Sequence, residues 1–218
     1  MAEAGSPADP AARRTLVLAS DNAGKLRELA AMLQPLGWTL RPQSDWKISA
    51  AVEDGHGFIE NALIKARHAA RETGQPALAD DSGLVVDALG GAPGVHSARY
   101  AGEGARDADN NRKLLQALRG VPASGRSAHF YCAMVLVRHV DDPCPLLATG
   151  SWGGRILESG QGDGGFGYDP LFWLEEHGCT SAQLPPGKKN RLSHRSQALQ
   201  SLLTQLEGAD WNHEHDGA

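Results

Sequence analysis

The sequence has few cysteines, and their arrangement excludes two common uses of this residue. Its 218 residues contain three, Cys132, Cys144 and Cys179, which lie far apart and form no CxxC pair. A disulfide framework needs an even set, and a structural zinc site normally needs closely spaced pairs. We therefore expect three ordinary free thiols.

Long apolar runs and a secretory leader are also missing. No stretch approaches the ~20 apolar residues that cross a membrane. The first seven residues, MAEAGSP, lack the basic start and apolar core of a signal peptide. Apolar residues make up 41% and charged residues 22% of the chain, which is typical of a soluble globular protein. We expect a cytoplasmic protein that does not associate with a membrane.

An excess of basic charge is absent as well. The 21 lysines and arginines are outnumbered by 26 aspartates and glutamates, which gives a formal net charge of -5. Broad binding to a nucleic-acid backbone normally needs a basic face. We therefore expect no nucleic-acid partner, and any basic site must be local.

Composition and hydrophobic periodicity predict one domain over residues 15–207. Residues 1–14 are small and polar and residues 208–218 are polar and acidic, so both ends are predicted to be disordered tails. Strands are predicted over residues 16–19, 77–79, 84–86, 128–140 and 146–157, and helices over 26–33, 58–71, 110–118 and after Ser193. The two long strands form a hairpin, whereas the others alternate with helices. This order predicts an α/β fold whose mixed sheet is flanked by helices.

Two adjacent carboxylates follow a short apolar strand. Asp80 and Asp81 come directly after residues 77–79 and before a second apolar run, so we expect them at a break between two strands. Two neighbouring anions repel each other unless a cation or several donors compensate them. A simple turn, with one aspartate capping the backbone and the other in water, is the alternative. We favour a divalent metal with phosphate, and rank Glu53 above Glu60 as a further carboxylate.

A polar turn opens the first helix and has the composition of an anion site. Its residues are Ser20, Asp21, Asn22, Ala23, Gly24 and Lys25. Backbone N–H groups and the helix dipole favour a phosphate there, and Lys25 adds a positive charge. The segment departs from the P-loop pattern at two positions. Ala19 stands where the pattern has its first glycine, and Leu26 stands where it has a metal-binding Ser or Thr. A helix capped by Ser20 or Asp21, with a solvated lysine, stays open as the alternative.

A glycine-rich stretch ends in aromatic residues. Five glycines between positions 160 and 167 accompany the sequence Phe166, Gly167, Tyr168 and Asp169. Glycine permits close backbone approach, and two aromatic rings offer surfaces for a flat ligand ring. Core packing is the rival interpretation. An aspartate between an aromatic residue and a proline, after so many glycines, favours a binding loop.

A basic segment stands out in this acidic chain. Residues 188–195 read KKNRLSHR and include Lys189. Such charge runs are usually solvated surface. Ser193 is placed to cap the last helix, which leaves His194 and Arg195 in its first turn, where cations oppose the helix dipole. That conflict favours a bound anionic or polar ligand.

In combination, these segments resemble the inosine triphosphate pyrophosphatase family, hydrolases of non-standard purine nucleoside triphosphates. The resemblance covers residues 15–207 and rests on segments in the family's order, namely SDNAGKLRE (20–28), FIENA (58–62), ADDSGL (79–84), GGAPG (90–94), GFGYDP (165–170) and SHR (193–195). The loop GVHSARY (94–100) is most similar to the bacterial branch.

The resemblance implies hydrolysis of ITP, dITP and XTP to the monophosphate and pyrophosphate with Mg²⁺. It implies a homodimer with a two-lobed fold and the active cleft between the lobes. Asp81 would be the proton acceptor and a metal ligand, Glu53 a second metal ligand, and Ser82 a substrate contact. Residues 20–25 would bind the triphosphate. The base would be held by Phe166, Gly167, Tyr168, Asp169, Lys189, His194 and Arg195.

Two departures from the family pattern affect detail, and rival functions stay open. Gly57 replaces the usual helix-capping Ser or Thr, and Asp21 puts a negative charge near the expected triphosphate. A related house-cleaning pyrophosphatase for other modified nucleotides would use the same metal chemistry. A non-catalytic nucleotide- or RNA-binding module would need structural carboxylates, which the net charge disfavours. A phosphatase with an aspartate nucleophile is weaker, because Ser82 stands where its second Asp is needed.

Overall fold

The computed structural model describes residues 14–208 of the chain. The predicted tails, residues 1–14 and 208–218, therefore lie almost wholly outside the described residues. The two exceptions are Arg14, which already begins strand β1, and Gly208, which ends helix α5.

Within residues 14–208, seven strands form one mixed sheet in the order β2-β1-β3-β4-β5-β6-β7. The strands are β1 Arg14–Leu18, β2 Trp38–Pro42, β3 Ala77–Val86, β4 Ser127–Val137, β5 Leu146–Ile156, β6 Phe172–Leu174 and β7 Cys179–Thr180. Strand β1 runs parallel to both β2 and β3, and every other neighbouring pair is antiparallel. This confirms the predicted mixed sheet, including the β4–β5 hairpin.

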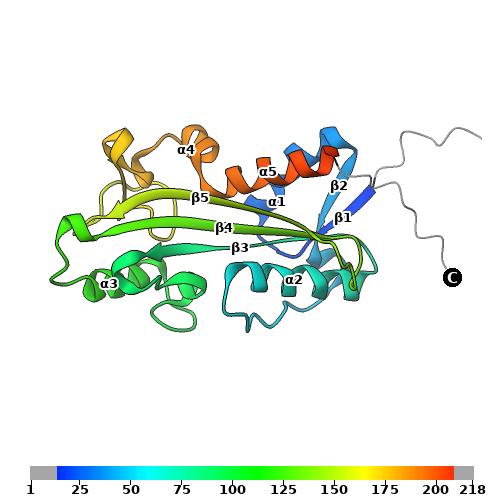
Figure 1. Cartoon of the computed structure of the whole chain (residues 1–218), viewed down its shortest axis with the longest axis horizontal. Coiled ribbons are helices and arrows are strands. Elements are labelled where there is room, and N and C mark those ends of the chain that lie inside the picture. The colour runs from blue at the N-terminus through cyan, green and yellow to red at the C-terminus, as the bar shows by residue number, and fades with distance from the viewer. Residues whose placement is uncertain (1–13, 209–218) are drawn as a thin grey trace, which may run out of the picture.

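Helices cover both faces of the sheet. They are α1 Ala23–Leu33, α2 Phe58–Thr73, α3 Asp107–Ala117, α4 Pro186–Leu192 and α5 His194–Gly208. Helices α1, α4 and α5 lie on one side of the long strands, and α2 and α3 lie on the other (Figure 1). Strands β3, β4 and β5 extend past both α2 and α3, which lie at opposite ends of the same face (Figure 1). No helix within residues 14–208 is long and apolar enough to cross a membrane.

Strand β3 runs uninterrupted through the two aspartates, so the predicted strand break is wrong. Asp80 pairs with Met134 of β4, and Asp81 pairs with Ala133. Because successive side chains of a strand point to opposite faces, the two carboxylates leave the sheet in opposite directions. They therefore lie in different surroundings although they are adjacent in sequence.

Small side chains let α2 lie close to the sheet. Ala62, Ala66 and Ala69 are fully buried against Ala79 and Ala133 of the strands. The distance between packed elements depends on the side chains at their contact, and alanine keeps it short. This close packing brings the polar side chains of α2 next to Asp81.

The start of helix α2 is stabilised by hydrogen bonds although a glycine occupies its N-cap. Gly57 has no capping side chain, but Oε2 of Glu60 accepts hydrogen bonds from the backbone N–H groups of His56 and Gly57, at 2.6 and 3.2 Å. These bonds satisfy N–H groups at the helix start that would otherwise lack partners. The loosening expected from Gly57 is therefore offset, and Glu60 serves the helix start.

Candidate active site

Two cavities are lined by successive residues of β3, one by Asp80 and the other by Ser82, Gly83 and Leu84. The first, here called the charged cavity, has a volume of about 240 Å³ and is lined by Ala19, Ser20, Asp21, Lys25, Gln43, Ala50, Ala51, Glu53, Lys65 and Asp80. The second, here called the aromatic cavity, has a volume of about 210 Å³. Its lining includes Ser82, Phe130, Trp152, Phe166, Tyr168, Lys189, His194 and Arg195.

The charged cavity forms because β1 ends before its neighbour β3 does. The parallel pairing of these strands stops at Leu18 and Leu78, and β3 continues to Val86. Ligands of open α/β sheets commonly bind beyond the carboxyl ends of parallel strands. Here the polar turn after β1 and the next residues of β3 share that position.

Asp80 points toward α1 and α5 and is compensated by two cations. Nζ of Lys25 lies 2.8 Å from each carboxylate oxygen, and Nε of Arg195 lies 3.6 Å from Oδ2. Burial alone would raise the pKa of Asp80, but Lys25 and Arg195, with Lys65 further away, outweigh it and lower the pKa to about 2. Asp80 therefore stays ionised and orients both cations.

Asp81 points to the other face, toward α2. Nζ of Lys65 donates to Oδ1 at 3.2 Å, and Nδ2 of Asn61 donates to Oδ2 at 3.2 Å. The same ammonium lies 3.3 Å from Oε2 of Glu53. Burial and then the negative charge of Glu53 raise the pKa of Asp81, although Lys65 and Asn61 oppose the rise. Asp81 is consequently more basic than an ordinary aspartate.

The polar turn before α1 is only partly free to hold an anion. The side chain of Asn22 accepts hydrogen bonds from the N–H groups of Gly24 and Lys25, at 2.9 and 3.1 Å. Asn22, and neither Ser20 nor Asp21, is thus the helix cap. The carboxylate of Asp21, which lines the charged cavity, accepts from Nε2 of Gln43 and from the N–H of Ser44. These bonds fix its orientation and lower its pKa, so its negative charge stays at the cavity.

The carboxylates near Lys65 are suited to a metal ion that takes its other ligands from water and substrate, and not to one held by protein ligands alone. Within residues 14–208, no three His, Cys, Asp or Glu side chains are grouped so as to hold a metal by themselves. Glu53 and Asp81 nevertheless face a common cationic group, the ammonium of Lys65. Mg²⁺ commonly takes one or two protein carboxylates and completes its ligands with water and substrate phosphate. Glu53 and Asp81 fit that requirement.

The aromatic cavity has a stacked pair of rings on its wall. The imidazole of His194 lies almost parallel to the ring of Phe130, with centroids 5.1 Å apart and an angle of 14°. Burial and then the charge of Arg195 lower the pKa of His194 to about 3, so the imidazole is neutral at physiological pH. Its Nδ1 is buried and has no hydrogen-bond partner among residues 14–208. A neutral ring with a free nitrogen is available to a polar ligand atom.

Phe166 and Tyr168 occupy different environments within one loop. The side chain of Phe166 is 66% exposed, and Nζ of Lys189 lies 4.8 Å from its ring centroid. Tyr168 is buried in the core, and its hydroxyl donates to the carbonyl oxygen of Ser97 at 2.8 Å. Phe166 is the ring with a free face, whereas Tyr168 anchors the loop.

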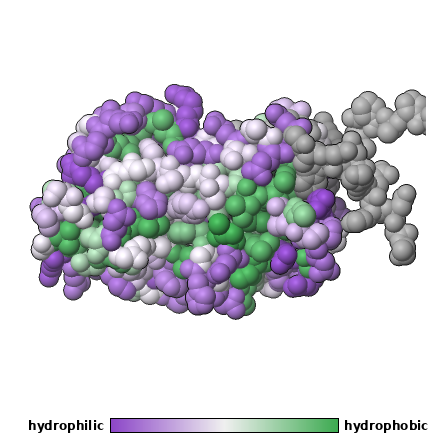
Figure 2. Space-filling view, viewed as in Figure 1, coloured by the Kyte–Doolittle hydropathy of each residue, from purple (hydrophilic) through white to green (hydrophobic). Residues whose placement is uncertain are grey.

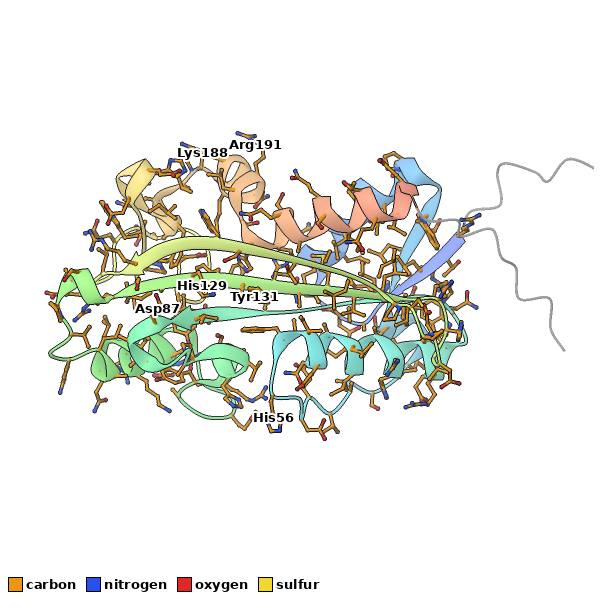
Figure 3. The ribbon with its side chains drawn as sticks, in the orientation of Figure 1. His56, Asp87, His129, Tyr131, Lys188 and Arg191 are labelled. Carbon is orange, nitrogen blue, oxygen red and sulfur yellow. The ribbon has the colours of Figure 1, made fainter. Side chains whose placement is uncertain are left out.

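Asp169 connects three parts of the aromatic cavity. Its Oδ2 accepts from the N–H of Phe166 at 2.8 Å and pairs with the ammonium of Lys189, and its Oδ1 accepts from the hydroxyl of Ser181 at 2.8 Å. Within the basic segment, only some cations join this network. Lys189 lines the cavity, whereas Lys188 and Arg191 are exposed and extend outward from α4 (Figure 3).

Sequence reasoning missed several residues that line or support the two cavities, and four of them bear most on the proposed chemistry. Asn61 and Lys65 contact Asp81, and Phe130 and Trp152 line the aromatic cavity. The first two carried a usable signal, because they are polar, four residues apart and therefore on one face of a helix whose other face is alanine-rich. The aromatic pair carried none, since alternating strand residues are usually core.

The fold and site define a class of protein, an α/β protein whose paired cavities suit a ligand with a flat ring at one end and negative charge at the other. The chain belongs to the Ham1 family, whose sequence profile matches residues 16–205. This match confirms the resemblance seen in the sequence segments.

Similar proteins cover almost the whole chain. The dITP/XTP pyrophosphatase of Photobacterium profundum is 55% identical over 89% of this chain and 98% of its own. That of Pseudomonas syringae is 56% identical over 88% and 96%. The solved structure of a HAM1 protein from Coxiella burnetii is 48% identical, covers 90% of this chain and 100% of its own, and superposes with a TM-score of 0.87. A nucleoside-triphosphatase / dITP/XTP pyrophosphatase from Mycobacterium abscessus, 40% identical over 88% and 99%, gives 0.76.

Proposed function

We propose that this protein hydrolyses the non-standard purine nucleoside triphosphates ITP, dITP and XTP to the monophosphate and pyrophosphate. The observation that carries the proposal is that Asp80 of β3 lines a charged cavity while Ser82 of the same strand lines an aromatic cavity, and that Arg195 of the aromatic cavity pairs with Asp80. The names of the similar dITP/XTP pyrophosphatases support the same substrate class.

Asp81 is the proposed proton acceptor. A general base works best when its pKa lies near the working pH, and burial moves the pKa of Asp81 in that direction. Asn61 and Lys65 fix the orientation of the carboxylate through one hydrogen bond to each oxygen. Asp81 is thereby held to take a proton from a water that attacks the triphosphate.

Lys25 and Lys65 are the proposed phosphate contacts of the charged cavity. Each ammonium pairs with a carboxylate within the protein, Lys25 with Asp80 and Lys65 with Asp81 and Glu53. A bound triphosphate would share these cations and so balance the charge of the site. Glu53 and Asp81 would hold Mg²⁺, which neutralises phosphate charge and helps to orient water when it is bound.

The aromatic cavity is the proposed base site. Phe166 offers its exposed ring to a purine, and Ser82 lines the same cavity. Nε of Arg195 lies 3.6 Å from Oδ2 of Asp80, whereas buried Nδ1 of His194 has no hydrogen-bond partner among residues 14–208. In the tautomer that carries its proton on Nδ1, His194 would donate to the 6-keto oxygen of a purine, whereas adenine presents a 6-amino group and leaves that donor unpaired. This difference favours ITP and XTP over ATP.

A substrate panel tests the proposal. Purified protein is incubated with ITP, dITP, XTP, GTP, ATP and a modified pyrimidine triphosphate, with and without Mg²⁺. Pyrophosphate and orthophosphate are measured separately. We expect Mg²⁺-dependent release of pyrophosphate, fastest from ITP, dITP and XTP. Orthophosphate release or no turnover would overturn the proposal, and a preference for the pyrimidine would favour a related house-cleaning enzyme.

A homodimer in the cytoplasm is part of the same proposal. Val52 is 79% exposed and Ile59 is 40% exposed, and apolar residues also form a band across the face shown in Figure 2. Exposed apolar surface of this kind is often covered by a partner. Sedimentation equilibrium at micromolar concentration tests the assembly, for which we expect twice the mass of the chain and no dependence on added nucleic acid.

A further inference from the structure

Helix α3 holds both backbone polar groups of one glycine in the aromatic loop. The N–H of Gly167 donates to Oδ2 of Asp107 at 2.6 Å, and Nδ2 of Asn111 donates to the carbonyl oxygen of Gly167 at 2.9 Å. Asp107 and Asn111 are four residues apart, so they share one face of α3. The two bonds join segments that are 60 and 56 positions apart in the sequence.

Gly167, which these two bonds hold, has a left-handed backbone conformation. Gly167 has a φ of +61°, and the glycine-rich segment before it has great freedom in an unfolded or loosened state. Fixing such a segment costs conformational entropy. Two hydrogen bonds to a regular helix offset part of this cost and restrict the loop before a ligand arrives.

The two hydrogen bonds from α3 to Gly167 affect the position of Phe166 more than the positions of Tyr168 and Asp169. Tyr168 is fixed independently by its burial and its bond to Ser97, and Asp169 by its bonds to Ser181 and Lys189. Phe166 is 66% exposed, so core packing does not fix its ring. Its direction depends on the backbone of residues 166 and 167, which are held by Asp169 and by α3, and on the ammonium of Lys189 over the ring.

We propose that Asp107 and Asn111 are positioning residues for purine recognition, which act by holding Gly167 so that the ring of Phe166 stays at the aromatic cavity. The inference rests on the proposed function, in which Phe166 stacks on the purine. Preorganised contacts raise affinity because less ordering remains to be done on binding. α3 thus determines how strongly the base contributes to substrate binding, although it lies outside the charged cavity.

The test compares a substrate that has a base with one that lacks it. KM and kcat are measured for ITP and for ribose 5-triphosphate in the unaltered protein, Asp107→Ala, Asn111→Ala and the double variant. Stacking of a base on an aromatic ring is worth about 5- to 150-fold in affinity. We expect the double variant to lower the ratio of KM for ribose 5-triphosphate to KM for ITP about fivefold. Asp107→Asn, which keeps an acceptor oxygen, should lower this ratio less than Asp107→Ala does.

Two controls separate positioning from general damage. Asp109→Ala removes a carboxylate from the same helix turn, where it accepts from the N–H of Arg106 and pairs with the side chains of Arg106 and Arg112, so it should leave the KM ratio unchanged. In a Phe166→Ala background, the double variant should cause no further change in the ratio, because its effect passes through that ring.

The outcomes are distinguishable. An unchanged ratio in the double variant, or an equal loss in the Phe166→Ala background, would overturn the role of Asp107 and Asn111 while ITP turnover persists. If the unaltered protein released no pyrophosphate from ITP, the proposed function would fail first, and this inference would fail with it.

Discussion

The charged and aromatic cavities are similar in volume, about 240 and 210 Å³, but they are built on opposite principles. In the charged cavity, lysines pair directly with carboxylates, so that a phosphate or a metal ion has charges to redistribute. In the aromatic cavity, rings surround an imidazole that burial keeps neutral, and Asp169 takes up the charge of Lys189. Charge serves the proposed chemistry in the charged cavity, and aromatic surface with the unpartnered Nδ1 of His194 serves the proposed recognition in the aromatic cavity.

The two aspartates show the same contrast within one strand. Asp80 and Asp81 face opposite sides of the sheet, and their pKa values shift in opposite directions. Two cations stabilise the charge of Asp80, so the role we expect for Asp80 is structural. Burial opposes the charge of Asp81, which makes it a better proton acceptor.

Removing the charge of Asp81 should have the largest effect on turnover. Asp81→Asn keeps the size of the side chain but loses the proposed base, and we expect kcat for ITP to fall about 10³-fold or more. Because burial raises the pKa of Asp81, its charge does not stabilise the fold, and the melting temperature should not fall. Pyrophosphate assays and thermal unfolding measure both. Activity within tenfold of the unaltered protein would remove Asp81 from the mechanism, and Asp109→Asn is the matched control.

Substitution of the adjacent Asp80, unlike that of Asp81, should lower the stability of the fold. Asp80→Asn leaves Lys25 and Arg195 without their buried carboxylate, and we expect the free energy of unfolding to fall by about 3 kcal/mol at pH 7. The folded-state pKa of about 2 is below the ordinary 3.8, so the stabilisation is present above pH 4 and is lost as the pH falls toward 2. Urea unfolding at pH 7 and pH 3 measures the difference. Equal stability at pH 7 would contradict the structural role of Asp80.

Glu53 tests whether the charged cavity holds a metal. Glu53→Gln should raise the Mg²⁺ concentration for half-maximal activity about 10- to 100-fold, because one of the two proposed protein carboxylates becomes neutral. Saturating Mg²⁺ should restore most of kcat. Titration of Mg²⁺ in activity assays checks this, with Glu72→Gln, an exposed carboxylate of α2, as the control. An unchanged Mg²⁺ requirement would exclude Glu53 as a ligand.

The smallest expected effect concerns His194 in the aromatic cavity. Its folded-state pKa of about 3 lies below the ordinary 6.5, so the unfolded chain binds a proton first as the pH falls. Lowering the pH from 7 to 5.5 should therefore cost the unaltered protein about 1 kcal/mol of stability through this group. His194→Gln should lose this dependence, whereas His56→Gln, which replaces an exposed histidine, should keep it. Denaturant unfolding at the two pH values measures it, and equal slopes in all three proteins would show that His194 titrates normally.

The elements with strong periodicity could be predicted from the sequence. The β4–β5 hairpin and helix α5 appear where their alternating and helical patterns indicated. The continuous β3 could not be predicted, because two adjacent aspartates are typical of a turn. They are tolerated in a central strand because Lys25 and Lys65, which are remote in sequence, compensate one aspartate each. Strand β2 and helix α4 were also missed, since both are short and lack clear periodicity.

The candidate site could be located from its motifs, but its pairings could not. Sequence segments indicated Lys25 and Asp80 separately, whereas only the folded chain shows that they form an ion pair. Likewise, the sequence predicted Ser20 or Asp21 as the cap of α1, whereas the folded backbone gives that role to Asn22. The stacking of Phe130 on His194 depends on the distance between β4 and α5, which no local pattern encodes.

The central claim is that one nucleotide spans both cavities. A crystal structure of the Asp81→Asn variant with ITP and Mg²⁺ tests it most directly, because slow turnover preserves the substrate. We predict the hypoxanthine against Phe166 in the aromatic cavity and the triphosphate beside Lys25 and Lys65 in the charged cavity. A base bound in the charged cavity, or a triphosphate directed away from both lysines, would contradict the account.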